Sequence, residues 1–108
     1  MLAAGATRVS AHAVLTRSSL RDTTVKANTA TSVTLTFNTG IEAGLTQITL
    51  RGEGPEQPLS ASPGNQPSQL VVALPPLAAG FYALRYKVLA ADGHVTEGVQ
   101  RFQVSAAE

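Results

Sequence analysis

The chain contains no cysteine. Disulfides, thiolate metal sites and cysteine nucleophiles are therefore all excluded. The sequence also has only two histidines and one methionine among its 108 residues. Any bound metal must then be held by histidine, carboxylate or backbone-derived donors, and the set of candidate ligands is very small.

Long apolar runs and clusters of one charge are also missing. No apolar run reaches the ~18 residues that indicate a membrane span, so we expect no direct membrane insertion. Eight basic and seven acidic residues are scattered along the chain and leave a net charge of +1. Without a basic cluster or an array of aromatic residues, nucleic acid is not an expected partner.

Familiar catalytic motifs are absent as well. The chain has no glycine-rich phosphate loop and no serine in a G-x-S-x-G turn. Its carboxylates Glu42, Glu53, Glu56 and Glu97 are isolated in segments that resemble loops, which is typical of solvated surface residues. We therefore expect no catalytic residues and no enzymatic turnover.

The length fits a single domain. Residues 1–11 differ from the rest, because they are small and weakly polar and end in Val9-Ser10-Ala11, a pattern that signal peptidase accepts. We interpret them as the remnant of a signal peptide or an artificial leader; the alternative is a chain end without function. Residues 12–105 then form the domain and residues 106–108 a short tail.

Most of the domain alternates polar and apolar residues with a period of two, which is typical of strands. The stretch Gly52–Pro67 is rich in proline and glycine, so we expect loops around at most one short edge strand there. No segment resembles a useful amphipathic helix. The clearest predicted strands are Ser32–Phe37, Gln47–Leu50, Gln69–Leu74, Phe81–Ala90 and Gly98–Val104.

Along the longest predicted strand, Tyr82, Leu84, Tyr86 and Val88 fall on one face, which we expect to face the core. About seven short strands separated by turns are the pattern of an antiparallel sandwich or barrel. The sequence therefore predicts an all-β domain.

The segment after that strand contains the best candidate ligands. Asp92 and His94 are two residues apart, so in an extended segment they project to the same side. Gly93 lets the backbone bend between them. By itself an Asp-Gly-His triplet is more often a turn with a polar tip than a metal site.

His12 adds to this pair. Cleavage after Ala11 would give His12 a free α-amine beside its imidazole. With the Asp92 oxygen and the His94 nitrogen, the site has three nitrogens and one oxygen, a set that suits tetragonal Cu(II). Zinc could use the same atoms in tetrahedral form; alternatively, His12 only starts a strand and its ring is solvated.

Several motifs, in unbroken order from His12 to Val104, resemble the CopC-like family of copper resistance and homeostasis proteins. The chain has His12-Ala13 at the predicted mature end, where that family has its N-terminal ligand histidine. Three further segments resemble the family patterns V-T-L-T-F-S, L-P-x-L-x-x-G-x-Y and W-x-V-x-S-x-D-G-H-x-x-x-G: Val33–Asn38, Leu74–Tyr82 and Tyr86–Gly98.

The resemblance implies a seven-stranded Greek-key β-sandwich or barrel of cupredoxin-like or Ig-like outline, located in the periplasm. It implies a Cu(II) site formed by His12, Asp92 and His94. Family members bind or relay copper, often beside a CopD-like inner-membrane copper transporter, and none is securely an enzyme. We expect a monomer that sequesters, transports or delivers copper.

The chain also departs from the family pattern. Thr39 stands where some members have a glutamate near the metal, and Leu20 replaces the usual proline of an S-x-P motif near the end of the first strand. Tyr86 replaces a tryptophan. The only methionine is Met1, and Cu(I) selects soft thioether ligands, so we expect no Cu(I) site.

Two other functions are compatible with part of the pattern. An N-terminal histidine with a second histidine is also the ligand arrangement of copper polysaccharide monooxygenases, which are oxidative enzymes. Against this, Asp92 fills a coordination position that such chemistry leaves to oxygen or water, and no flat aromatic surface is evident. An Ig-like structural module without a metal is the other alternative, but it leaves the ordered motifs unexplained.

Overall fold

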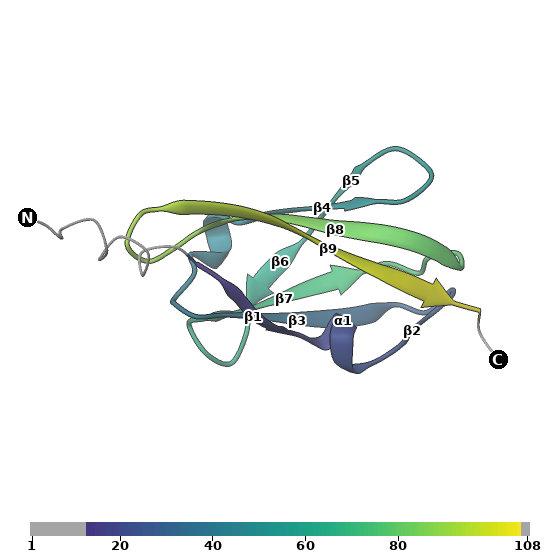
Figure 1. Cartoon of the computed structure of the whole chain (residues 1–108), viewed down its shortest axis with the longest axis horizontal. Helices are drawn as coiled ribbons and strands as arrows, with labels where there is room; N and C mark the ends of the chain where they lie inside the picture. Colours follow the sequence, from purple (N-terminus) through teal and green to yellow (C-terminus); the bar gives the residue numbers. More distant parts are fainter. Residues whose placement is uncertain (1–12, 107–108) are drawn as a thin grey trace, which may run out of the picture.

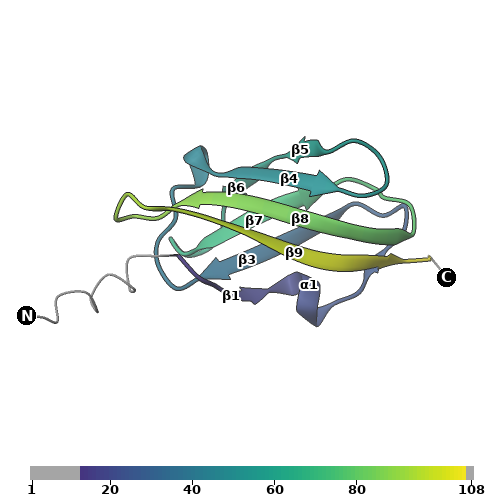
Figure 2. The ribbon, with the colours of Figure 1, turned by 45° about the horizontal axis from the view of Figure 1, so that its top comes forward.

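The structure is a computed structural model that describes residues 13–106 (Figure 1). Two β-sheets pack face to face as a sandwich, which Figure 2 shows from a second direction. One sheet has the strand order β1 (Leu15–Ser18), β3 (Thr31–Phe37), β7 (Gln69–Leu74), β6 (Ala61–Pro63). The other has the order β2 (Val25–Lys26), β9 (Val95–Ser105), β8 (Gly80–Leu89), β4 (Gln47–Arg51), β5 (Gln57–Leu59).

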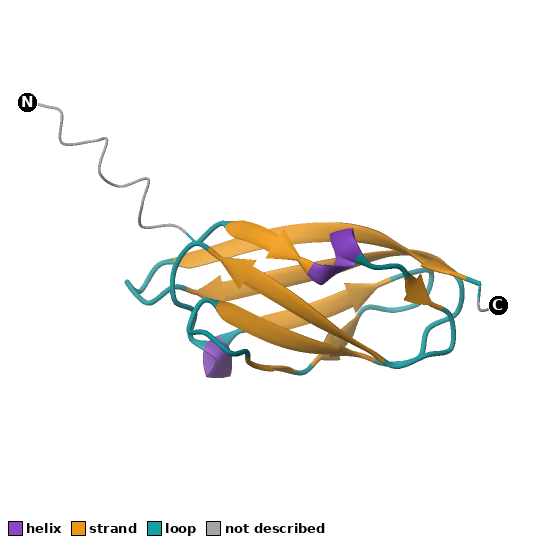
Figure 3. Ribbon diagram, turned by 90° about the horizontal axis from the view of Figure 1, so that it is seen from below, coloured by secondary structure: helices purple, strands orange, loops and turns teal. Residues whose placement is uncertain are grey.

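Helical structure is limited to two short segments. Helix α1 (Ser19–Asp22) lies between β1 and β2 (Figure 3), and a 3₁₀ helix, η2, spans Ala43–Leu45. Within residues 13–106, neither helix has the length or the apolar character needed to cross a membrane.

The core lies between the two sheets and is built from alternate residues of each strand. Leu84 and Val88 of β8 are fully buried, whereas Phe81 and Arg85 on the opposite face are exposed, as the alternation predicts. Tyr82 and Tyr86 are partly buried and pack against the core. The largest fully buried apolar side chains are Leu35, Leu70, Leu74, Leu84, Val33, Val72, Val88 and Val104.

The all-β prediction is confirmed, and the structure refines its details. The described residues form nine strands instead of about seven, because β2, β5 and β6 are only two or three residues long. Both β5 and β6 lie in Gly52–Pro67, where we expected at most one short strand. Each contains a proline, and each is the last strand of its sheet, a position that tolerates a residue without an N–H group.

One pairing differs from the antiparallel expectation. The first part of the chain divides between the sheets: β1 pairs antiparallel with β3, whereas β2 pairs parallel with β9 at Val104 and Ser105. All other strand pairs in the described part of the chain are antiparallel. The chain thus crosses between the two sheets while forming its first two strands.

The hairpin of β8 and β9 positions the candidate ligands. Its register runs without interruption from Gly80 opposite Val104 to Leu89 opposite Val95. Strand β9 therefore begins three residues before the predicted Gly98. The connection, residues 90–94, lies at one end of the sandwich, the end at which the described chain begins (Figure 1).

Candidate metal site

The connection between β8 and β9 is a tight turn. The N–H of Ala90 donates to the carbonyl of His94 at 2.8 Å, and the N–H of Gly93 donates to the carbonyl of Ala90 at 2.9 Å. Gly93 has a φ of +92°, a backbone conformation that residues with a Cβ rarely adopt. The glycine between the two candidate ligands is therefore required by the turn.

Asp92 and His94 lie next to each other. The His94 backbone N–H donates to Asp92 Oδ1 at 3.0 Å, and His94 Nδ1 lies 3.2 Å from Asp92 Oδ2. The side chains are 39% and 57% exposed, respectively. The prediction that the Asp92 and His94 side chains project to the same side is confirmed, but the reason given for it, an extended segment, is wrong. The segment is a turn closed by the Asp92 side chain instead of an extended strand.

The same hydrogen bond affects the charge of the site. The His94 backbone N–H, as the main cause, lowers the pKa of the Asp92 carboxyl below its ordinary value of 3.8; the His94 side chain adds to this effect, and partial desolvation opposes it. Asp92 is therefore an anion at neutral pH, the state that a metal ligand requires.

A neighbouring loop connects this turn to the beginning of the described chain. The N–H of Ala91 donates to the carbonyl of Gly40 at 2.9 Å. Two residues earlier, Asn38 Oδ1 accepts from the Val14 N–H at 2.8 Å, and the Asn38 N–H donates to the Val14 carbonyl at 3.0 Å. Loop 38–41 thus contacts both Val14 and the turn that contains the candidate ligands.

His12, the third predicted ligand, lies outside the described residues. Ala13, which follows it, is 2% exposed and belongs to the buried core. Asn38, which fixes Val14 through two hydrogen bonds, was not among the predicted site residues. Its place after a predicted strand was visible, but the contact depends on the register between β1 and β3.

The pair is compatible with a chelated metal but does not complete a site. Two adjacent ligands at about 2.0 Å from a four-coordinate metal are roughly 3 Å apart, close to the 3.2 Å between Nδ1 and Oδ2. Between residues 13 and 106, no group of three or more His, Cys, Asp or Glu side chains is arranged to hold a metal. Further donors must come from elsewhere in the chain, from the backbone or from water.

Comparison with known families decides the assignment. The model of the CopC domain matches residues 15–105, most of the chain. The chain belongs to the CopC family. This confirms the resemblance that the ordered motifs suggested. Because CopC proteins are copper-binding resistance proteins, the assignment also confirms the expectation that this is not an enzyme.

Solved structures agree with the family assignment. The chain is similar to CopC from Methylosinus trichosporium OB3b, with 28% identity and a TM-score of 0.72; the match covers 90% of this chain and 97% of that one. A structure of PcoC, a copper resistance protein from Escherichia coli, has 24% identity and a TM-score of 0.61, covering 85% and 99%. A second PcoC structure, of a protein described as methionine rich, has 24% identity and a TM-score of 0.59, covering 87% and 99%. No curated protein matches the chain.

Proposed function

We propose that this CopC-family chain is a periplasmic Cu(II)-binding protein that sequesters, transports or delivers copper without turnover. The observation that supports this most is the contact between Asp92 and His94, which presents an anionic oxygen and an imidazole nitrogen on one turn. Membership of a copper resistance family gives the metal its identity.

The proposed ligands are His12, Asp92 and His94. When the chain begins at His12, the α-amine and the ring of that residue add two nitrogens to the Asp92 oxygen and the His94 nitrogen. This set favours Cu(II), which prefers tetragonal nitrogen and oxygen coordination. When residues 1–11 are attached, the His12 nitrogen is part of a peptide bond. Three side-chain donors then remain, water is the fourth ligand, and binding is weaker.

We propose no Cu(I) site. Cu(I) prefers thioether and thiolate ligands, and the chain offers only Met1 and no cysteine. The Escherichia coli relative is described as methionine rich, so the two chains differ in the residues available for Cu(I). A Cu(II)-only protein follows from this composition.

The proposed location and partner rest on the family. CopC proteins are periplasmic, and the small residues before His12 resemble a cleavage site. The proposed recipient or donor of copper is a CopD-like inner-membrane transporter, and the protein acts as a monomer. The location is tested by expressing the chain with an export signal and measuring the intact mass of the periplasmic product. The mature chain should begin at His12. A periplasmic product that retains residues 1–11 contradicts the proposed cleavage.

Cu(II) competition titrations test the ligand set. The chain that begins at His12 should bind one Cu(II) per molecule, and His94→Ala should weaken binding at least ~10-fold, since one of four donors is lost. Glu97→Gln is the matched control, because Glu97 is a nearby exposed carboxylate outside the proposed ligand set. Equal, weak binding by the parent chain and by His94→Ala would refute the proposal.

A further inference from the structure

The two long sides of the sandwich differ. On one side the chain passes directly from β5 in one sheet to β6 in the other. Strand β5 pairs with β4, and strand β6 pairs with β7. On the opposite side, β1 is the edge of its sheet, and β2 covers β9 only at Val104 and Ser105. Within the described chain, residues 95–103 of β9 therefore have a strand partner, β8, on one side only. This leaves a long free strand edge.

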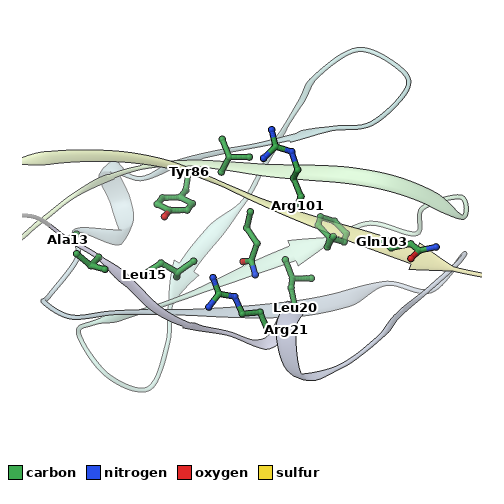
Figure 4. Close-up of a pocket in the computed structure, with 11 residues that line it drawn as sticks. Ala13, Leu15, Leu20, Arg21, Tyr86, Arg101 and Gln103 are labelled. Carbon is green, nitrogen blue, oxygen red and sulfur yellow. The ribbon is translucent and has the colours of Figure 1, made fainter.

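A groove of about 510 Å³ lies along this open side, between β1 with α1 and the free edge of β9. Leu15 and Leu20 line it from β1 and α1, and Tyr86 and Phe102 line it from β8 and β9. Figure 4 shows Tyr86 on one side of the groove, with Leu15 and Leu20 opposite. The groove therefore combines these side chains with polar ones, among them Arg21 and Arg101, beside a free strand edge.

Gln100 of β9 also lines the groove. It is only 7% exposed and, with Ser18, is one of the two buried polar residues in the described part of the chain. Its side-chain oxygen is buried and accepts no hydrogen bond from the described residues. A buried amide oxygen without a donor is unfavourable and rare in folded proteins. Gln100 thus contributes an unsatisfied polar group to the wall of the groove.

The charges at the groove are of one sign. Arg21 and Arg101 lie on opposite rims (Figure 4), and no carboxylate is among the residues that line the groove. Within residues 13–106, neither arginine forms an ion pair, whereas Arg17 and Arg85 pair with Asp22 and Glu56. The rims are therefore complementary to a ligand that carries a carboxylate.

We propose that this groove binds an extended, acidic peptide segment of a partner protein, which adds to the free edge of β9 as a further strand. Main-chain hydrogen bonds to a free strand edge give such complexes their affinity. Alternate side chains of the segment pack on Leu15 and Leu20, and its carboxylates pair with Arg21 and Arg101. Neither Asp92 nor His94 lines the groove, and peptide binding there requires no metal.

A short synthetic peptide tests the proposal on the metal-free full chain. The probe alternates valine and threonine, carries aspartate at both ends and has blocked termini. NMR spectra should show shifts in the backbone amides of residues 95–103 and of β1. Matched peptides with lysine for aspartate, or with proline at alternate positions, should bind at least ~10-fold more weakly, because charge or main-chain pairing is lost.

Variants of the chain identify the side chains involved. Arg21→Gln and Arg101→Gln should each weaken binding of the aspartate peptide about tenfold. Arg51→Gln, on the exposed face of β4 and outside the groove, should leave binding unchanged. Gln100→Met should keep or raise the melting temperature of the free chain, because the unsatisfied oxygen is removed. Arg21→Gln and Arg101→Gln variants that both bind the aspartate peptide like the parent chain overturn the proposed charge pairing.

Three outcomes would overturn the proposed occupant. Equal binding of the aspartate, lysine and proline peptides shows non-specific adsorption. If the chain sediments as a dimer, and the NMR signals of the β9 amides shift on dilution but not on addition of peptide, the groove binds a second copy of the chain. Binding to phosphatidylglycerol vesicles without any response to the peptide assigns it to an anionic lipid surface.

Discussion

Asp92 has two separate tasks in this structure. One carboxylate oxygen accepts a hydrogen bond from the His94 backbone N–H and closes the turn. The other lies 3.2 Å from Nδ1 of His94, which is itself a proposed copper ligand. The first task needs only a hydrogen-bond acceptor, whereas the second benefits from a negative charge. An asparagine can perform the first task but not the second.

Asp92→Asn should therefore separate folding from copper binding. The amide oxygen still accepts the His94 N–H, so we expect the melting temperature to change by only a few degrees. Cu(II) affinity should fall at least ~10-fold because the anionic ligand is lost. Thermal unfolding without metal and Cu(II) competition titration measure the two effects. If the variant loses folding stability to the same extent as it loses Cu(II) affinity, the substitution has disrupted the turn, and the loss of the ligand does not explain the result.

Gly93→Ala tests the backbone of the same turn. At a φ of +92° an added Cβ strains the main chain, although no atom lies within 4 Å of that Cβ. We expect a loss of about 1–2 kcal/mol in the free energy of unfolding, measured by chemical denaturation. Gly44→Ala is the control, since its added Cβ also meets nothing within 4 Å and its φ is not positive. A similar loss in both variants would contradict the conformational explanation.

At the residue scale, the sequence predicted that the side chains of Asp92 and His94 lie together, because a spacing of two has this result in either a strand or this turn. The contact of Asn38 with Val14 was not predictable, since it joins residues 24 positions apart. The effect of replacing the family proline by Leu20 also needed the structure: the Leu20 N–H donates to Ser18 Oγ at 3.2 Å, a bond that proline cannot form.

At the scale of elements, the hairpin of β8 and β9 contains a matched pair, Tyr86 and Gly98. The two residues are opposite each other in the register, and a Cβ on Gly98 would overlap the Tyr86 ring and hydroxyl. The Tyr86 ring also packs edge-on against Phe37 of the other sheet, with centroids 5.5 Å apart. Gly98 thus makes room for an aromatic side chain that joins the two sheets, where the family pattern has a tryptophan.

Tyr86 should also make the stability of the sandwich sensitive to alkali. Burial raises the pKa of the Tyr86 phenol above its ordinary value of 10.0, and Arg21 partly opposes this. The folded state therefore holds the phenolic proton more tightly than the unfolded chain. This contribution to stability is complete below pH 10 and is lost as the pH rises through the folded pKa.

Tyr86→Phe keeps the ring and removes this titration. As the pH rises from about 9 to values above the folded pKa of Tyr86, the free energy of unfolding of the parent chain should fall more steeply than that of the variant. Urea denaturation at a series of pH values measures the difference between them. A difference that stays constant with pH would contradict the raised pKa of Tyr86.

Strand prediction succeeded where hydrophobic alternation is strong. The predicted Gln69–Leu74 has the same bounds as β7, and the inward face of β8 was assigned correctly. The short strands β5 and β6 were not predicted individually, because Pro58 and Pro63 hide the strand signal. Their pairing depends on neighbours in each sheet that local sequence does not reveal.

At the scale of the whole molecule, the sandwich places the turn 90–94, loop 38–41 and the start of β1 at one end (Figure 1). The proposed copper site is at this end, and the open groove lies along one side. Asp92 and His94 are outside the lining of the groove, whereas Ala13 and Val14 at the start of the described chain belong to it.

Copper should stabilise this domain by mass action. With free Cu(II) at 100 times the dissociation constant, the folded state of the chain that begins at His12 gains about 2.7 kcal/mol. For a domain of this size we expect the melting temperature to rise on the order of 10 °C. Calorimetry with and without Cu(II) measures this rise. His94→Ala should show a much smaller one, and equal rises in both chains would indicate binding elsewhere.

Electron paramagnetic resonance of the Cu(II) complex tests the proposed ligand set most directly. For the chain that begins at His12, we predict an axial, tetragonal spectrum with hyperfine coupling to three nitrogens: the amine, the His12 ring and the His94 ring. The 108-residue chain should lose the amine coupling, and His94→Ala should lose one ring coupling. A spectrum that is the same for all three proteins would contradict a copper site formed by His12, Asp92 and His94.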